Sequence, residues 1–497
     1  MTLVVASLVE RSIAGVSRSS KKAFEAGADL VEIRLDILRG IDAHPNLVQD
    51  ARGAVDGAAV ATLRSTFEGG RSDLKGGARR AMLERVVDSG FEYTDLELAR
   101  DAHLLKELGS SRGGTKAIAS YHFSRPVAKA LVRQRLEKGL AARAVAKIAM
   151  PCANAAQAVM LAELAGDISA KGKPFVLIGM GAQGQLTRVC ASGMRSELAY
   201  ACLPGKEAAP GQLDVRTQAG LAKHGSVILG LIGHPVSHSV SRPMQEAALR
   251  SVDLNGIYLP LDIPPERMNR RLVATLFDIG FRGLNVTIPN KQKAYRLCDI
   301  RSESARNTAA VNTLHLQKGK IVGENTDVKG FQQLISLKKV RVKNARILVI
   351  GAGGAARAVC KALSDGGAEI VVAARRPKAA SDLAKACGSS WTPYPALGTA
   401  TETYDIMVNT TPIGTKGAKD ELSNLPENAI KNSRIFVDLV YNPSTTPSMA
   451  VARRFGRTAH GGLEMLVRQG EEAFKIWTGK SPDVSKMRLA ARRVLES

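Results

Sequence analysis

A single lysine interrupts the otherwise small and apolar run ARAVAKIAM at positions 142–150. A buried ammonium group without a partner is costly, so Lys147 either reaches solvent or is kept partly desolvated. A desolvated lysine has a lowered pKa and can attack a carbonyl carbon near neutral pH. His122, which follows an earlier apolar run, is suited to remove the α-proton beside an iminium and then to protonate a leaving hydroxyl. Together the two residues predict Schiff-base chemistry. Considered alone, Lys147 could equally be a lysine that faces solvent, and His122 could be a structural histidine.

Ionisable residues stand at the same end of several successive apolar runs. Glu32, Arg34 and Asp36 alternate along one run, and a period of two places all three on one face of a strand. Arginines at such positions can bind a substrate carboxylate, while carboxylates can pair with these cations or bind hydroxyls. The other residues at these positions are Arg64, Asp95, Glu97, Arg188 and Gln212.

Residues 1–220 alternate short apolar runs with helical or loop segments. The runs are LVVAS, LVEIRL, AAVATL, YTDLEL, KAIAS, AVAKIA, FVLIG and LAYACL. Eight β/α units in this length favour a (β/α)8 TIM barrel, in which the chemistry lies at the carboxyl ends of the strands. We therefore expect an α/β protein whose N-terminal barrel gathers these ionisable residues at its mouth.

A glycine-rich stretch, VIGAGGAARAV, follows an apolar run in the second half and begins a helical segment. Glycines there let the backbone approach a pyrophosphate at a helix N-terminus, as in a Rossmann domain. The next strand-like run ends in Arg375 and Arg376 rather than in an acidic residue, which favours NADP over NAD; exposed arginines without a ligand are the alternative. The predicted phosphate loop is Gly351, Ala352, Gly353, Gly354 and Ala355.

Amides, hydroxyls and one lysine–aspartate combination precede this stretch. Lys291 and Asp327 can relay a proton to a carbonyl that is being reduced, although either alone also fits a surface charge. Ser239 and Ser241 can face one carboxylate. The residues suited to polyol hydroxyls are Asn285, Thr287, Asn312 and Asn325.

Composition excludes several other classes of protein. The 497 residues carry a formal net charge of +24, but the basic residues are spread along the chain and aromatic residues are only 4%, which disfavours nucleic-acid binding. The six cysteines form no CxxC pair, and no cluster has metal-ligand spacing, so we expect a reducing compartment and no metal. No apolar run is long enough to span a membrane, and the N-terminus lacks a signal-peptide pattern.

Residues 1–220 resemble type I 3-dehydroquinate dehydratases through EIRLD (32–36), TLRSTFEGG (62–70), ASYHF (119–123), AKIA (146–149), GMGAQGQLTR (179–188) and APGQ (209–212). The resemblance implies that Lys147 forms the Schiff base and that His122 is the general acid/base. Ala208 and Ala209 depart from a serine that often precedes PGQ. Residues implied to bind substrate or shape the pocket are Glu32, Arg34, Arg64, Glu68, Arg188 and Gln212.

Residues 226–497 resemble shikimate dehydrogenases through HSVS, NVTIPNK, NTD, VNTTPIGT, VDLVYNPSTTP and GLEMLVRQGEEAFKIWTG. The resemblance implies that Lys291 and Asp327 are catalytic. Asn290 stands where a histidine is usual, and Ala374 and Arg376 depart from the usual turn, so the NADP preference rests mainly on Arg375. Further residues implied on the substrate or nicotinamide side are Asn409, Thr410, Tyr441 and Gln469.

We therefore expect a bifunctional enzyme that dehydrates 3-dehydroquinate to 3-dehydroshikimate and reduces this to shikimate with NADPH. The expected domains are the barrel at 1–220, a shikimate-binding catalytic domain at 226–335 and 460–497, and a Rossmann NADP-binding domain at 336–459. We expect small-molecule ligands only and a cytoplasmic location; a plastid form with its transit peptide removed fits the sequence equally well. Two alternatives stay open: an aldolase-like enzyme joined to an NAD-dependent quinate dehydrogenase, and a non-enzymatic scaffold.

Overall fold

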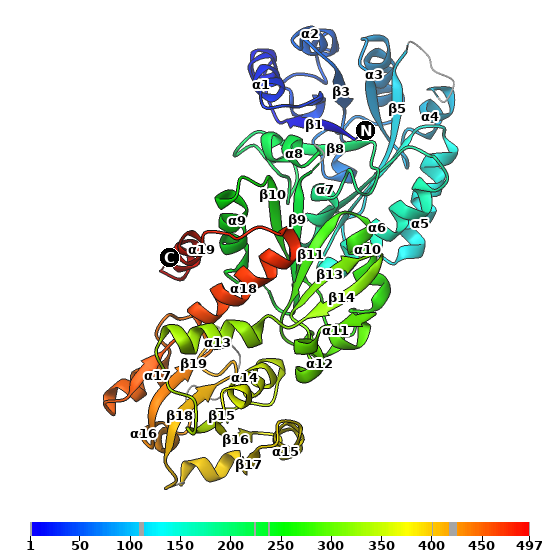
Figure 1. Cartoon of the computed structure of the whole chain (residues 1–497). Coiled ribbons are helices and arrows are strands. Elements are labelled where there is room, and N and C mark those ends of the chain that lie inside the picture. The colour runs from blue at the N-terminus through cyan, green and yellow to red at the C-terminus, as the bar shows by residue number, and fades with distance from the viewer. Residues whose placement is uncertain are drawn as a thin grey trace. The chain divides into compact units, whose positions relative to one another are not determined.

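The computed structural model describes residues 2–108, 114–222, 225–236, 239–399, 401–416 and 425–496, and Figure 1 shows its elements. The chain forms two compact units. One comprises residues 1–228, 261–263 and 271–281, and the other comprises the remaining residues. Each unit is described by itself below.

The first unit contains a nearly closed barrel of eight parallel strands in the order β7-β6-β5-β4-β3-β2-β1-β8. This arrangement confirms the predicted (β/α)8 fold, and each strand coincides with one of the eight apolar runs. The strands are β1 (Leu3–Leu8), β2 (Leu30–Arg34), β3 (Ala59–Thr62), β4 (Tyr93–Glu97), β5 (Lys116–His122), β6 (Val145–Pro151), β7 (Phe175–Met180) and β8 (Leu198–Cys202).

Helices cover the outside of this barrel because each offers an apolar stripe to the strands. In α1, for example, Val16 and Ala23 are buried, and the Ser12 side chain caps the first turn by accepting a hydrogen bond from the Gly15 backbone N–H. The barrel helices are α1 (Ile13–Glu25), α2 (Leu47–Gly53), α3 (Gly76–Asp88), α4 (Ala102–Leu108), α5 (Lys129–Ala141), α6 (Ala155–Ser169), α7 (Leu186–Val189) and α8 (Val215–Ala222).

A mixed sheet in the order β10-β9-β11-β13-β14-β12 forms the first part of the remaining chain. Its strands are β9 (Val227–Gly233), β10 (Gly256–Asp262), β11 (Phe281–Val286), β12 (Ile300–Arg301), β13 (Thr313–Gln317) and β14 (Lys320–Glu324). The helices beside it are α9 (Ser241–Ser251), α11 (Lys291–Leu297), α12 (Glu303–Thr308), α18 (Leu463–Thr478) and α19 (Val484–Glu496). Helix α10 (Arg270–Asp278) belongs, apart from its first residue, to the first unit. Helices α18 and α19 return from the end of the chain, and both pack against α9.

A second six-stranded sheet is entirely parallel and has the order β17-β16-β15-β18-β19-β20. Counted from its first strand, this is the 3-2-1-4-5-6 order of a dinucleotide-binding Rossmann fold, as predicted. Its strands are β15 (Arg346–Ile350), β16 (Glu369–Ala374), β17 (Ser390–Pro393), β18 (Tyr404–Asn409), β19 (Ser433–Asp438) and β20 (Thr458–His460). Its helices are α13 (Asp327–Leu337), α14 (Gly354–Asp365), α15 (Pro377–Ala386), α16 (Glu427–Lys431) and α17 (Pro447–Arg454).

Candidate active sites

A cavity at the carboxyl ends of the barrel strands brings seven of the predicted residues together. They come from β2, β5, β6 and from segments that follow other strands, which is why they lie far apart in the sequence. The predicted residues that line the cavity are Glu32, Arg34, Arg64, His122, Lys147, Arg188 and Gln212; Ser7, Thr62 and Tyr200 also line it.

Lys147 is buried, with 3% of its surface exposed, so it does not escape to solvent. Its Nζ lies 3.0 Å from Asp95 Oδ2 and 3.8 Å from Glu32 Oε1. The same nitrogen lies 3.9 Å from the centroid of the Tyr200 ring. The apolar run tolerates this lysine because carboxylates and an aromatic face from other strands compensate its charge inside the barrel.

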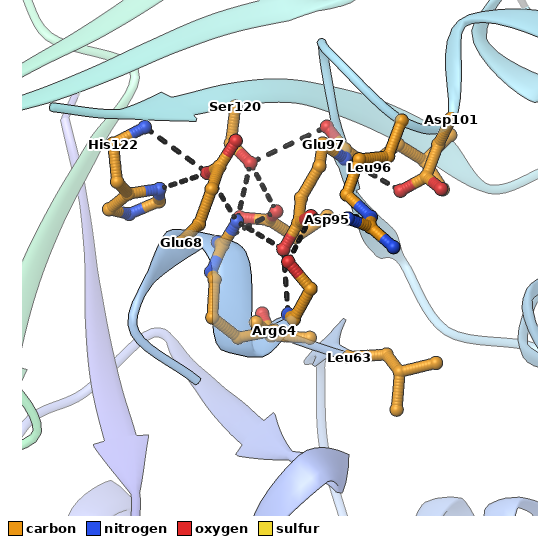
Figure 2. Close-up of polar contacts among 12 residues, drawn as sticks. Leu63, Arg64, Glu68, Asp95, Leu96, Glu97, Asp101, Ser120 and His122 are labelled. Carbon is orange, nitrogen blue, oxygen red and sulfur yellow. Dashed lines mark hydrogen bonds and ion pairs between the residues drawn. The ribbon is translucent and has the colours of Figure 1, made fainter. Parts of the chain in front are cut away.

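Arg64 is the centre of a buried ionic network beside this lysine (Figure 2). It donates hydrogen bonds to Asp95 Oδ1 at 2.9 Å, to Ser120 Oγ at 2.9 Å and to Glu68 Oε2 at 3.2 Å. Burial opposes ionisation of Asp95, but Arg64 and Lys147 hold the pKa of its carboxyl below the usual range. Asp95 is therefore a permanent carboxylate that links the arginine to the lysine.

Glu68 lies beside His122, also shown in Figure 2. Its Oε2 is 2.8 Å from His122 Nδ1 and accepts a further hydrogen bond from the His122 backbone N–H at 3.1 Å. Burial raises the pKa of Glu68 to about 8 against the pull of Arg64. Burial, together with the charges of Arg64 and Lys147, lowers the pKa of His122 well below its ordinary value. Because Glu68 occupies Nδ1, Nε2 is the ring nitrogen left for a substrate.

The remaining cavity residues offer two cations, Arg188 and Arg34, and several groups that suit hydroxyls. Arg188 donates from Nη1 to the Tyr200 carbonyl at 3.1 Å, and its buried Nε has no hydrogen-bond partner among the residues that the structure describes. Burial lowers the pKa of Arg188 to about 10, which leaves it charged at neutral pH. A buried guanidinium with a free donor suits a carboxylate ligand.

Several polar side chains of the cavity are held in place by hydrogen bonds to one another and to neighbouring residues. Glu32 accepts hydrogen bonds from Ser7 Oγ at 2.6 Å and Thr62 Oγ1 at 2.8 Å. Two hydrogen bonds of 2.8 Å to Asp36 fix the Arg34 guanidinium. Gln212 accepts from the backbone N–H of Ala208 at 2.7 Å and donates to Ser7 at 3.2 Å.

Lys291 and Asp327 form the centre of a second cluster, at the N-termini of α11 and α13. Lys291 Nζ lies 2.5 Å from Asp327 Oδ2. Asn312 donates to Asp327 Oδ1 at 2.8 Å and to Gln469 Oε1 at 3.3 Å. The predicted lysine–aspartate combination is thus in direct contact, with two predicted amides beside it.

Hydroxyl and amide groups extend this second cluster. Ser239 and Ser241 lie with their hydroxyl oxygens 3.0 Å apart, and Tyr441 hydrogen-bonds to Ser239. Asn285 accepts from the hydroxyl of Tyr258 at 2.8 Å and donates to the Asn312 carbonyl at 3.2 Å. Thr287, just after β11, donates its backbone N–H to the Ile232 carbonyl at 2.8 Å.

Asn325 has a different place from its predicted neighbours. Its amide donates to Thr308 Oγ1 at 2.9 Å and to the Ala310 carbonyl at 3.0 Å. Its oxygen accepts from the Asp327 backbone N–H at 3.1 Å. These contacts use the side chain to hold the start of α13 rather than to face a ligand.

The glycine-rich loop between β15 and α14 has the geometry of a phosphate site. Gly351 has a φ of +117°, and a Cβ there would lie 2.4 Å from Thr410 Oγ1, so only glycine fits. A Cβ on Gly353 would meet nothing within 4 Å, which leaves this turn open to a ligand at the helix N-terminus. The loop also contains Ala352, Gly354 and Ala355.

Two exposed arginines, Arg375 and Arg376, follow β16 beside this loop. Together with the open glycine turn they fit a dinucleotide that carries a 2′-phosphate. Thr410 donates to the Ile350 carbonyl at 2.7 Å and so fixes the neighbouring loop. Asn409 is fully buried and donates to Asp438 at 2.9 Å, which makes it a support of the site rather than a surface for the nucleotide.

Sequence reasoning missed four residues of the two sites. Ser7 is in register with Glu32 and Thr62 with Arg34, so the alternation that identified Glu32 and Arg34 could have found them. Tyr200 and Tyr258 gave no signal, because an aromatic residue inside an apolar run is usually core.

The residues that the structure describes contain no group of three or more His, Cys, Asp or Glu side chains that could hold a metal ion. Among the same residues, no helix is both long enough and apolar enough to cross a membrane.

Four family models match the chain in order. The model described as "Type I 3-dehydroquinase" matches residues 4–220, and "Shikimate dehydrogenase substrate binding domain" matches residues 231–314. "Shikimate / quinate 5-dehydrogenase" matches residues 333–451, and "Shikimate 5'-dehydrogenase C-terminal domain" matches residues 462–492. The barrel cavity lies within the first match, and Lys291, Asn312 and Gln469 of the second site lie within the second and fourth, whereas Asp327 lies between two matches.

One similar protein covers nearly the whole chain, and two others cover about half of it. A bifunctional 3-dehydroquinate dehydratase/shikimate dehydrogenase of Arabidopsis thaliana, described as chloroplastic, is 30% identical over 96% of this chain and 82% of its own. A shikimate dehydrogenase (NADP(+)) of Archaeoglobus fulgidus is 40% identical over 54% of this chain and 98% of its own. A crystal structure of a shikimate dehydrogenase with NADP+ is similar at a TM-score of 0.51 and 33% identity, over 55% of this chain and 97% of its own.

Proposed function

Because the chain belongs to the family of bifunctional enzymes that join a type I 3-dehydroquinase to a shikimate dehydrogenase, we propose which of its residues perform each reaction. The enzyme is a lyase and an NADP-dependent oxidoreductase of the shikimate pathway. It dehydrates 3-dehydroquinate to 3-dehydroshikimate and reduces this product to shikimate. The observation that carries the assignment of residues is the buried Lys147 in one cavity with His122.

Lys147 attacks the ketone carbon of 3-dehydroquinate, and loss of water from the adduct gives an imine. The imine draws electrons from the neighbouring carbon and so acidifies its proton. His122 Nε2 removes this proton and returns it to the leaving hydroxyl. Hydrolysis of the imine then releases 3-dehydroshikimate and restores the lysine. Two observations support these roles: Lys147 faces the cavity, and Glu68 leaves Nε2 of His122 available.

The other cavity residues bind and position the substrate. Arg188 binds the carboxylate through its unpartnered donor, and Glu32, Arg34 and Gln212 bind hydroxyls. Glu68 does not line the cavity; it positions His122, and Arg64 positions Glu68 and Asp95. Thus the predicted set splits into ligand-binding and positioning residues.

In the second site Lys291 delivers a proton to the carbonyl oxygen that is reduced, and Asp327 holds the lysine in place. Bound NADPH supplies the hydride. Ser239 and Ser241 bind the carboxylate of the substrate. The residues proposed for its hydroxyls are Asn285, Thr287, Asn312, Tyr441 and Gln469, whereas Asn325 holds the start of α13.

The nucleotide is proposed to lie on the glycine turn of residues 351–355, with Arg375 and Arg376 at its 2′-phosphate and Thr410 and Asn409 supporting the loop. We propose the domain limits given above, namely 1–220, 226–335 with 460–497, and 336–459. A cytoplasmic location is proposed on the six cysteines, all of them free thiols. The relative from Arabidopsis thaliana is described as chloroplastic, so targeting of a tagged full-length chain tests this point.

A coupled assay tests the two activities together. The enzyme receives 3-dehydroquinate and NADPH, and the enone absorbance and nucleotide oxidation are followed at once. We expect the enone to rise and then fall as nucleotide is oxidised, with NADPH strongly preferred to NADH. Nucleotide oxidation without an enone, or preference for NADH, would refute this order of reactions.

A further inference from the structure

A buried arginine outside the barrel cavity, Arg79, extends the ionic network of Arg64. It lies near the start of α3 with 3% of its surface exposed, whereas the neighbouring Arg80 is exposed. Its Nε and Nη2 each donate a hydrogen bond of 2.8 Å to Asp101. Its Nη1 donates to the Leu63 carbonyl at 3.1 Å, directly before Arg64 in the chain. The guanidinium is therefore fixed beside the network although it does not line the cavity.

Glu97 joins this arginine to the active site. Its Oε2 lies 3.6 Å from Arg79 Nη2, and its Oε1 lies 3.4 Å from Arg64 Nη1. Ser65 donates to both oxygens, from its backbone N–H at 2.8 Å and from its hydroxyl at 2.7 Å. The partly exposed Arg100 is farther from the carboxylate, at 3.9 Å. Two buried arginines therefore share Glu97, which also holds the residue that follows Arg64.

Positive and negative side chains alternate along this series of contacts, part of which Figure 2 shows. From the cavity outward the members are Lys147, Asp95, Arg64, Glu97, Arg79 and Asp101. A buried charge is tolerated only where an opposite charge compensates it, so each member depends on its neighbours. Removal of an outer cation should therefore displace the inner one.

We propose that Arg79 is a positioning residue of the dehydratase, which acts through Glu97 and Arg64 and touches no substrate. Because Arg79 compensates part of the Glu97 charge, Arg64 can point towards the cavity, where it holds Asp95 at 2.9 Å and Glu68 at 3.2 Å. The inference rests on the dehydratase roles proposed above.

Loss of the Arg79 charge should change the protonation of Glu68. The charged and titratable groups that face Glu68 are Arg64 after β3, Asp95 and Glu97 on β4, and His122 on β5. Arg64 lowers the pKa of Glu68, whereas Glu97 raises it. Without Arg79, Glu97 should draw Arg64 towards itself and away from Glu68, so the pKa of Glu68 should rise. The acidic limb of the dehydratase pH profile should then move to higher pH.

A pair of neighbouring variants tests the proposal in the full-length protein. Arg79→Gln is compared with Arg80→Gln, which changes an exposed arginine of the same helix. Rates are divided by the amount of Lys147 that borohydride traps with 3-dehydroquinate, so that unfolded chains do not count. In Arg79→Gln we expect dehydratase kcat to fall about ten- to a hundredfold, because a small misplacement of catalytic groups is costly. Its acidic limb should move up by about half a pH unit or more.

The other measurements serve as controls. Arg80→Gln should match the wild type in rate and in pH profile, and shikimate oxidation should be unchanged in every preparation. Arg79→Lys keeps the charge but cannot form both hydrogen bonds to Asp101, so its limb should lie between those of the wild type and Arg79→Gln.

A wild-type rate and pH profile per trapped site in Arg79→Gln would overturn the proposal. A lower rate with an unmoved limb would do the same, because it would indicate a structural role only. If Arg79→Gln gives no folded enzyme, the limb of Arg79→Lys decides, and failure of both variants to fold would also leave only a structural role. An untrapped Lys147 in the active wild type would instead refute the proposed imine.

Discussion

Glu68 Oε2 lies 2.8 Å from His122 Nδ1, and the same oxygen accepts a hydrogen bond from Arg64. This contact makes the carboxyl group and the imidazole one proton-binding unit. The unit accepts the α-proton of the substrate only after it has lost its own extra proton. Because burial raises the pKa of Glu68 to about 8, the active form accumulates as pH rises towards about 8.

Glu68→Gln should therefore lower dehydratase kcat by about one to two orders of magnitude. The acidic limb of its pH profile should move to lower pH, because the variant lacks the carboxyl that titrates. Borohydride trapping at Lys147 should persist, since the lysine is intact. Glu84→Gln, on the exposed face of α3, is the matched control. A Glu68→Gln enzyme with the wild-type profile would contradict the positioning role.

Tyr200 should stabilise the Lys147 ammonium group through its aromatic ring and not through its hydroxyl. The ring lies 3.9 Å from Lys147 Nζ, and its buried hydroxyl has no hydrogen-bond partner among the described residues. Tyr200→Phe should keep dehydratase kcat within about threefold, whereas Tyr200→Leu should lower it by about tenfold, the size of a partly desolvated cation–π contact. Steady-state kinetics of both variants decide the point, and equal losses would assign the effect to the hydroxyl or to packing.

Lys291→Ala and Asp327→Asn should each reduce shikimate oxidation by at least about two orders of magnitude, because they remove the proton donor or the group that holds it. Dehydratase activity of the same preparations should be unchanged. Lys320→Ala, which removes an exposed lysine of β14, should leave both activities intact. Parallel loss of both activities in the Lys291 variant would argue against separate sites.

The stability of the nucleotide-binding lobe should depend on pH through Asp438. This carboxyl is fully buried, and burial raises its pKa to about 6 although it accepts hydrogen bonds from Thr446, Val440 and Asn409. A raised carboxyl pKa makes the folded state bind its proton more tightly than the unfolded state. The stabilisation is therefore complete at acid pH, declines as pH rises from about 4 to about 6, and is absent above that range.

Asp438→Asn should abolish this decline, which corresponds to about 3 kcal/mol for a shift of this size. The measurement is the midpoint of the NADP+-shifted thermal transition between pH 4 and pH 7.5 in the wild type and the variant. Asp382→Asn, which changes an exposed carboxyl of α15, is the control. If the wild-type and Asp438→Asn midpoints changed in parallel over this range, a group other than Asp438 would be responsible for the pH dependence.

The architecture could be predicted from local patterns in the sequence, because strands and tight turns depend mainly on residues that are close together along the chain. Alternation along each strand placed Glu32 and Arg34 at the barrel mouth, and the glycine turn predicted the Rossmann sheet. The groups that compensate the positive charge of Lys147 could not be predicted, because Asp95 and Tyr200 lie on strands about fifty residues before and after it in the sequence.

The same limit applies to the residues that position others. The resemblance implied that Glu68 binds substrate or shapes the pocket, and the structure places it against His122 and Arg64. The amide of Asn325 was predicted to suit a hydroxyl, and the structure places it against Thr308 and the start of α13. Such roles follow from three-dimensional packing, which spacing along the chain does not encode.

Imine formation at Lys147 is tested most directly by borohydride reduction of the enzyme during turnover of 3-dehydroquinate, followed by peptide mass analysis. The peptide containing Lys147 should gain the mass of the reduced ligand, dehydratase activity should be lost in proportion, and Lys147→Ala should not be labelled. An unmodified Lys147 peptide in a preparation that was turning over substrate, or label on another lysine, would contradict imine formation at this residue.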